Sequence, residues 1–279
     1  MTAIKNLSPI AVSLNFDSFS EQLGFPSGFT DRSFSDGFAC LSSIAAQRNI
    51  PLSIFVIGKD LENKEHAAQV KDWAAQGHEI GNHSWSHRVD LGSLSDSRIR
   101  DEINKSHDII SSVTGIEPCG FIAPAWSSSS RIYKHLIEKK YVYDHSQFAS
   151  ILLYPLVFKM AINHLKDVNR LKQVLNRQDW LYPFTKPSTA HFVNNEGKIA
   201  KVSEKNKILI LPTPQVGCLR IGLWHTLGFV FGWDFLFRKM EIALKQKPDY
   251  YHLIHPADFL DGEYLPTGST HHLERMNVL

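Results

Sequence analysis

The chain has 279 residues, of which 43% are hydrophobic and 21% are charged. This composition excludes a disordered chain and is sufficient for one sizeable core. Thirty lysines and arginines stand against 28 aspartates and glutamates, which leaves a formal net charge of +2. A net charge so close to zero gives no overall electrostatic footprint for nucleic acid, so we expect no nucleic-acid partner.

The beginning of the chain contains no recognisable secretion signal. Residues 1–9 hold one lysine and no long apolar run, and a strand-like pattern starts directly afterwards. Three scattered cysteines form neither a disulfide framework nor a zinc ribbon, which is typical of a reducing compartment. We therefore expect a soluble protein of the cytoplasm.

Short apolar runs alternate with longer helix-period segments over the first half of the chain. The run at 52–57, for example, is rich in β-branched residues and is bounded by Pro51 and Gly58. The expected elements are strands at 10–16, 52–57, 78–83, 119–123 and 141–144 and helices at 34–48, 60–76, 95–113 and 130–139. Such alternation indicates an α/β fold with parallel strands and helical crossovers. Either an open sheet or a barrel satisfies the pattern.

The second half of the chain is less regular. A helical stretch at 157–175 precedes a turn-rich segment at 182–187, and further strands are expected at 208–211 and 250–255. The apolar segment 219–237 is interrupted by charged residues and glycines, so a buried helix is expected there, with peripheral membrane contact as the alternative. We predict one domain over residues 1–279 with an insertion at about 150–207.

Polar residues follow several of the expected strands, where parallel α/β proteins bind their ligands. Asp17 follows the first strand, and His83 and His87 follow the third. Asp144 ends the fifth strand and His255 ends the last. His83 and His87 are four positions apart, so on one helical turn both imidazoles would face the same way and share a metal. The alternative is that one histidine caps a helix and the other packs in the core.

The sequence Gly-His-Glu-Ile-Gly-Asn-His-Ser-Trp-Ser-His at 77–87 resembles the second motif of the polysaccharide deacetylases. These are the NodB-homology proteins of carbohydrate esterase family 4, in which the two histidines of His-(Ser/Thr)-x-x-His bind a divalent metal. Four further family motifs lie along the chain in the family's order, and the resemblance covers roughly 10–146 and 208–261. It implies a distorted (β/α) barrel with about seven parallel strands and an irregular insertion.

The resemblance implies a divalent metal, with Zn²⁺ as the expected ion, held by His83 and His87. The family's first motif, Thr-Phe-Asp-Asp, is Asn-Phe-Asp-Ser at 15–18. Asp17 therefore matches the catalytic base, whereas Ser18 stands where the family has a metal-ligating aspartate. A catalytic zinc site usually has three protein ligands. Either Asp17 turns to ligate the metal, or water completes its coordination, or the metal is held weakly.

The third family motif, Arg-x-Pro-(Tyr/Trp), is Ile-Ala-Pro-Ala at 122–125, followed by Trp126. In the family the arginine orients the base aspartate, which Ile122 does not do. The backbone amide of Ala125 is still expected to hold the oxyanion, because that role needs no side chain. Trp126 is expected to form a wall of the sugar site, with plain core packing as the alternative.

The remaining family matches lie at the ends of two strands, and two aspartates downstream of the first strand are further candidates. Asp144 resembles the aspartate of Tyr-Asp-Ser-Ser in deacetylases of surface-glycan assembly and is expected to support the site from behind. The match to the family's fifth motif, Leu-x-His, at 253–255 implies that His255 is the acid that protonates the leaving amine. Asp31 and Asp36 are candidate substitutes for the missing metal ligand, although turn and cap roles suit them better.

Our first interpretation is a metal-dependent hydrolase that removes an N-acetyl or other N-acyl group from an amino sugar. Its expected substrate is a cytoplasmic nucleotide-linked or lipid-linked precursor of a surface polysaccharide such as O-antigen. The second interpretation is a catalytically weakened or inactive sugar-binding relative, which the absent aspartate and arginine favour. A third, a barrel hydrolase with two metals, requires a His-x-His pair on the first strand that residues 15–17 lack.

Overall fold

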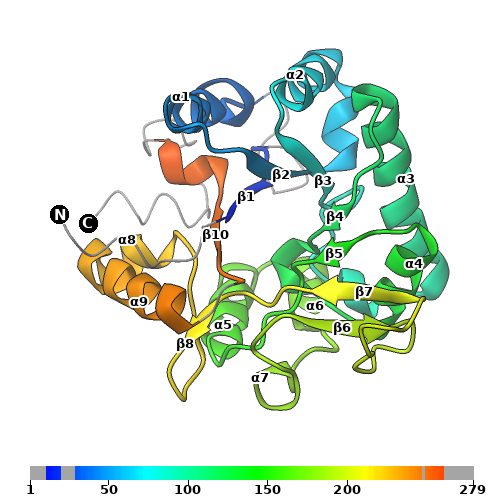
Figure 1. Ribbon diagram of the computed structural model, residues 1–279, viewed down its shortest axis with the longest axis vertical. Coiled ribbons are helices and arrows are strands. Elements are labelled where there is room, and N and C mark those ends of the chain that lie inside the picture. Colours follow the sequence, from blue (N-terminus) through cyan, green and yellow to red (C-terminus); the bar gives the residue numbers. More distant parts are fainter. Residues whose placement is uncertain (1–10, 20–28, 247–248, 261–279) are drawn as a thin grey trace.

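The computed structural model describes residues 11–19, 29–246 and 249–260, and its centre is one curled sheet (Figure 1). Eight strands in these ranges pair in the order β10-β1-β2-β3-β4-β5-β7-β6. Only β6 runs antiparallel to its neighbour. The expected α/β fold with about seven parallel strands is therefore confirmed, and the sheet is a half-barrel whose described edges are β10 and β6.

The parallel strands coincide with the apolar runs of the sequence, because their side chains are buried on both faces. Residues Asn82, Phe121 and Asp144 mark the carboxyl ends of the three central strands. The parallel strands are β1 (Ala11–Phe16), β2 (Leu52–Val56), β3 (Glu79–Asn82), β4 (Gly120–Phe121), β5 (Tyr143–Asp144), β7 (Lys207–Ile210) and β10 (Tyr251–Ile254).

One helix follows each of the strands β1 to β4, and these four helices lie on the outer side of the curled sheet (Figure 1). They are α1 (Phe38–Arg48), α2 (Lys64–Ala75), α3 (Asp96–Thr114) and α4 (Ser130–Glu138). In α3, the side chain of Ser95 accepts the backbone N–H of Arg98 at the first turn, and Gly115 ends the helix at φ 75°. The sequence therefore specifies both ends of this helix through a cap and a left-handed glycine.

Two predicted helix starts differ from the structure. Residues Ser33–Gly37 form a wider π-helical turn before α1. Residues Gly58–Glu62 form a 3-10 turn, and α2 begins only after Asn63, whose side chain accepts the backbone N–H of Glu65. The side chain of Asn63 competes with helix formation at the residues before it. Helix α2 therefore starts later than the apolar pattern of the sequence predicts.

The insertion leaves and re-enters the sheet at the same edge. It contains α5 (Leu153–Asn163), α6 (Val168–Leu175) and α7 (Tyr182–Thr185) and returns through β6 (His191–Asn194). Both Asp144 at the end of β5 and His191 at the start of β6 pair with Ile210 of β7. The three helices between them therefore lie on the carboxyl side of the sheet.

The helical stretch expected at 157–175 consists of two separate helices, the end of α5 and the whole of α6. Asp167 begins α6 by accepting the backbone N–H groups of Asn169 and Arg170. The antiparallel strand β6 was also not predicted, and it pairs with β7 over four residues. The division into one domain with an insertion at about 150–207 stays a prediction.

The apolar segment 219–237 is not one buried helix. It contains β9 (Ile221–Gly222), which pairs with β8 (Gln215–Val216), then α8 (Leu227–Phe231) and the start of α9 (Trp233–Gln246). Leu223 and Leu236 are buried, whereas Phe231 and Phe237 are exposed. Within the described ranges, no helix has the length and apolar character needed to cross a bilayer.

Candidate metal centre

Three side chains that follow the first and third strands meet at the carboxyl edge of the sheet. Oδ1 of Asp17 lies 3.2 Å from Nε2 of His83 and 3.3 Å from Nε2 of His87. Each residue offers one potential ligand atom, and the three atoms lie within 4.8 Å of one another. Two ligands of a tetrahedral zinc ion are roughly 3.3 to 3.6 Å apart, so these distances suit one shared cation.

The sheet brings Asp17 to the two histidines although His83 is 66 positions and His87 is 70 positions away from it in the chain. Strands β1 and β3 flank β2, with Phe16 paired to Val56 and Val56 paired to Asn82. Asp17 and His83 each follow directly after these strand ends, and the backbone N–H of His83 continues the ladder by donating to Val56. The parallel register therefore determines the meeting of the carboxylate and the first imidazole.

The facing atoms are buried without ordinary partners. Oδ1 of Asp17, Nε2 of His83 and Nε2 of His87 have no hydrogen-bond partner. The other ring nitrogen of His83, Nδ1, lies 2.6 Å from the carbonyl oxygen of Ile122, to which it donates as N–H. This hydrogen bond fixes the tautomer whose Nε2 lone pair faces Asp17. The residues present fit a divalent cation.

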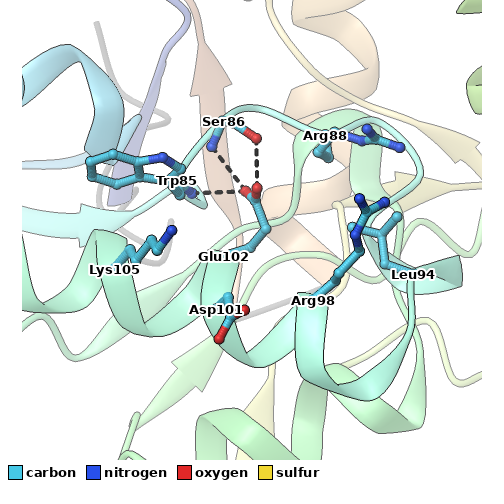
Figure 2. Close-up of a pocket in the computed structure, with 8 residues that line it drawn as sticks. All are labelled: Trp85, Ser86, Arg88, Leu94, Arg98, Asp101, Glu102 and Lys105. Atoms are coloured by element: carbon cyan, nitrogen blue, oxygen red, sulfur yellow. Dashed lines mark hydrogen bonds between the residues drawn. The ribbon is translucent and has the colours of Figure 1, made fainter.

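The loop that presents His87 is tied to α3 through Glu102. The Glu102 carboxylate accepts the backbone N–H groups of Trp85 and Ser86 at 3.1 and 2.9 Å and the Ser86 hydroxyl at 2.6 Å (Figure 2). This anchoring holds a loop in which Ser84 and His87 have φ of 65° and 52°. Left-handed backbone at non-glycine residues is costly and persists where the surrounding structure imposes it, often at functional sites.

The pocket drawn in Figure 2 lies against α3 and is distinct from the three-residue cluster. Its lining includes Trp85, Arg88, Arg98, Asp101 and Lys105, but not Asp17 or either histidine of the cluster. Glu102 in this pocket already accepts three hydrogen bonds from the loop. We therefore assign the pocket's acidic wall to loop support.

The electrostatics of the cluster suit metal ligation. Burial alone would raise the pKa of Asp17, but the imidazoles of His87 and His83 hold that pKa well below its usual range. Burial lowers the pKa of His83, although the Asp17 carboxylate opposes the effect. An ionised carboxylate and a neutral imidazole are the forms in which these residues ligate metals.

His255 lies at the end of β10, the strand next to β1. Its backbone N–H donates to Oδ2 of Asp258 at 2.8 Å, and its Nδ1 lies 3.7 Å from the same oxygen. Burial would lower the pKa of His255, but Asp258 and the charge of Asp17 outweigh it and raise this pKa. Sequence analysis did not identify Asp258, although a carboxylate three residues after the histidine was a visible signal.

The turn that contains Ala125 and Trp126 follows β4 and is strained. Ala125 has φ 49° and ψ 28°, and Trp126 has φ 53°. The Trp126 ring packs at 4.7 Å from Phe148 and 5.7 Å from Trp224, measured between ring centroids. Trp126 is half-buried, so it packs in the core and also retains an exposed part. Its expected role as a wall of the sugar site stays a prediction.

Asp144 supports this turn from behind and does not enter the cluster. Its Oδ1 accepts the Ser146 hydroxyl, whose oxygen accepts the backbone N–H of Ala123 at 2.7 Å. Asp144 is fully buried, and burial raises its pKa to about 7. Ile122 stands where the family has an arginine. Its backbone carbonyl accepts the hydrogen bond of His83, and its side chain is buried in the core.

A further carboxylate, Asp60, lies beside the position of the missing metal ligand. Ser18 is fully buried and its hydroxyl donates to Asp60, which also interacts electrostatically with His87 and Asp17. Sequence analysis assigned Asp60 to a helix start and missed it. Of the two candidates it named, Asp36 forms an ion pair with Arg32. Asp31 accepts the backbone N–H of Ser33 at 2.8 Å through Oδ1, but its Oδ2 has no hydrogen-bond partner and its charge acts on Asp60.

Comparisons with known proteins agree with this geometry. The family model described as polysaccharide deacetylase matches residues 5–143. The chain is 29% identical over 110 residues to a peptidoglycan deacetylase of Helicobacter pylori, covering 39% of this chain and 36% of that protein. It is 32% identical over 80 residues to a peptidoglycan-N-acetylglucosamine deacetylase of Bacillus cereus, covering 29% of this chain and 28% of that protein. The matches thus span about a third of the length of these relatives.

Among solved structures, the chain is similar to a Mycobacterium smegmatis protein described as a candidate polysaccharide deacetylase. The TM-score is 0.58 at 17% sequence identity, with 91% of this chain and 77% of that chain covered. This likeness extends through the insertion and the C-terminal elements, which the family model does not reach, and it shows the fold alone.

We predict that Asp144→Asn flattens the pH dependence of stability. Between about pH 4 and pH 7 the folded protein retains the Asp144 proton that the unfolded chain releases, so raising the pH favours unfolding in this window. The asparagine still accepts from Ser146 but does not titrate. Urea unfolding measures the free energy of unfolding at pH 4 and at pH 7.5. Between these pH values, its decrease in the variant should be up to about 4 kcal/mol smaller than its decrease in wild type. An identical loss in both proteins would contradict the assigned burial.

Proposed function

The chain belongs to the polysaccharide deacetylase family, and from this premise we propose that it is a metal-dependent hydrolase that removes an N-acyl group, foremost N-acetyl, from an amino sugar. The observation that carries the proposal is the convergence of Asp17, His83 and His87 through three buried atoms that lack partners. A divalent cation there, with zinc as the expected ion, supplies Lewis-acid chemistry that polarises an amide carbonyl and acidifies water.

The protein's own groups would act around the amide. His255 would donate a proton to the sugar nitrogen, because an amine leaves only when protonated, and Asp258 favours the protonated imidazole. The backbone amide of Ala125 would stabilise the oxyanion, and the chain from Asp144 through Ser146 to Ala123 holds its turn. The proximity of its Oδ1 to both histidine nitrogens supports Asp17 as a metal ligand. The alternative is that Asp17 acts as the base, and the metal content of an Asp17 variant distinguishes the two roles.

We further propose that the sugar is carried on a lipid. The insertion face, formed by α5, α6 and α7, exposes apolar side chains beside the carboxyl edge of the sheet. Phe158 and Phe184 are 67% and 68% exposed. A cavity of about 460 Å³ on this face is lined by Tyr154, Pro155, Val157, Phe158, Ala161, Leu175 and Trp180. Exposed apolar patches of this kind mark contacts with proteins or membranes.

Charge favours a membrane over a protein partner for the insertion face. Residues 151–187 contain six lysines and arginines and two aspartates, a local charge of +4 in a chain whose total is +2. Aromatic and aliphatic side chains among basic residues are typical of segments that lie in the interface of an anionic bilayer. This location would present a lipid-linked amino sugar to the metal centre from the same edge. The expected cytoplasmic location stays a prediction.

The direct test measures acetate release from N-acetylglucosamine oligomers by the zinc-loaded protein. We expect His83→Ala to lose both zinc and activity. His255→Ala should keep zinc and lose roughly 100- to 10,000-fold in rate, because only the proton donor is removed. In Asp17→Asn, loss of zinc would identify Asp17 as a ligand, and retained zinc without activity would identify it as the base.

A sugar-binding relative without catalysis is the second candidate, because neither Ser18 nor Ile122 provides the family's side chain. It would bind the oligomers but release no acetate with zinc, cobalt, nickel or manganese. This outcome, with the protein folded and metal-loaded, would contradict the proposed hydrolase.

The pH dependence of the rate tests His255 separately. Because the raised pKa of His255 keeps the proton donor charged to higher pH, activity should fall on the alkaline side as His255 deprotonates. Asp258→Asn removes the favourable carboxylate, so this limb should move to lower pH, with kcat at acidic pH largely retained. An unmoved alkaline limb in the folded variant would exclude Asp258 from control of the proton donor.

Vesicle sedimentation tests the insertion face. At physiological salt we expect binding to vesicles that contain phosphatidylglycerol and little binding to pure phosphatidylcholine. Phe158→Ser/Phe184→Ser should weaken binding at least tenfold, because each buried phenylalanine contributes about 1.5–3 kcal/mol. Ile116→Ser/Val142→Ser changes two similarly exposed residues at the amino edge of the sheet and should have no effect. Equal binding by both double variants, or turnover of only nucleotide-linked sugars, would contradict a lipid carrier.

A further inference from the structure

We propose that Asp60 is the second carboxylate of the metal centre and provides, through Ser18, the negative charge that position 18 does not supply. This inference rests on the proposed metal centre. Asp60 lies on the turn Gly58–Glu62 after β2, the strand between those that present Asp17 and His83. It therefore occupies the same edge of the sheet as the cluster.

Backbone hydrogen bonds tie the turn of Asp60 to the histidine loop. The N–H of Gly58 donates to the carbonyl of Ser84 at 2.9 Å, and the N–H of Lys59 donates to the carbonyl of Trp85 at 3.0 Å. A Cβ on Gly58 would approach Ser106 of α3 to 2.7 Å, so only glycine permits this close packing. Asp60 is thus held in a defined position beside the loop that ends in His87.

The Asp60 side chain is in an environment that a carboxylate does not occupy without a reason. It is 8% exposed, and its Oδ2 is buried with no hydrogen-bond partner. Within the described residues no arginine or lysine forms an ion pair with it, and the interaction with Ser18 involves a neutral hydroxyl. A buried, unpaired carboxylate costs stability, and such groups are found where a charge or ligand completes the site.

Charge balance identifies what completes it. The two imidazoles ligate in their neutral forms and Asp17 contributes one negative charge, so a divalent cation would leave the buried site with a charge of about +1. Ionised Asp60 would bring the total for the cation, Asp17 and Asp60 to zero, before the nearby charge of Asp31 is counted. Because Asp60 lies outside the set of mutually close ligand atoms, it would act from behind Ser18, orienting the hydroxyl and stabilising the cation electrostatically.

Zinc affinity, measured by competition with a chromophoric chelator, tests this inference without reference to activity. Asp60→Asn keeps the shape of the side chain and removes its charge, so we expect zinc affinity to fall roughly 10- to 100-fold. Glu62→Gln removes an equal charge from an exposed position of the same turn and should leave the affinity unchanged. Ser18→Asp/Asp60→Asn moves the carboxylate to position 18 and should restore most of the affinity.

Stability of the metal-free protein separates this role from a structural one. Because burial raises the pKa of Asp60 to about 7, the metal-free protein already holds much of this carboxyl in its neutral form, which asparagine resembles. The free energy of unfolding of Asp60→Asn without metal should therefore equal or exceed that of wild type while zinc affinity falls. Wild-type affinity in Asp60→Asn, an equal loss in Glu62→Gln, or no recovery in Ser18→Asp/Asp60→Asn would overturn the inference. A wild-type protein that binds no zinc would instead overturn the proposed metal centre on which it rests.

Discussion

The meeting of one carboxylate and two imidazoles at the carboxyl edge of a parallel sheet is the constraint on which the site depends. Oδ1 of Asp17 lies little more than 3 Å from the Nε2 atoms of His83 and His87, and among the described residues no further group pairs with these three atoms. Buried polar atoms are normally paired, so their arrangement suits a bound cation. The surrounding structure serves this geometry: Ile122 fixes one imidazole and Glu102 holds the loop of the other.

The rest of the edge is built from elements that are distant in sequence and close in the sheet. Strand β10 pairs with β1 and so places His255 beside the carboxylate's strand. Asp144 reaches the turn after β4 only through Ser146 and a backbone amide. The insertion helices cover the same side because β5 ends and β6 begins at one level of β7. The candidate metal site, its supporting contacts and the insertion helices thus share the carboxyl side of the sheet, where parallel sheets favour ligand sites.

Much of this arrangement was predictable from sequence because local patterns determine it. Apolar runs bounded by turn residues identified the parallel strands, and the motif at 77–87 identified His83 and His87. Two kinds of feature were not predictable. The break between α5 and α6 depends on one cap, Asp167, inside an otherwise helical pattern. The proximity of Asp60 to Ser18 arises only when β2 places the following turn against the histidine loop, a tertiary contact with no periodic signal.

The central claim is that one cation is bound by Asp17, His83 and His87 together. X-ray absorption at the zinc K-edge of the stoichiometrically loaded protein tests it most directly. The predicted spectrum contains two imidazole nitrogens at about 2.0–2.1 Å and carboxylate or water oxygens at about 2.0–2.2 Å, with one imidazole lost in His87→Ala. A spectrum with fewer than two imidazoles, or one unchanged by that substitution, would contradict the account.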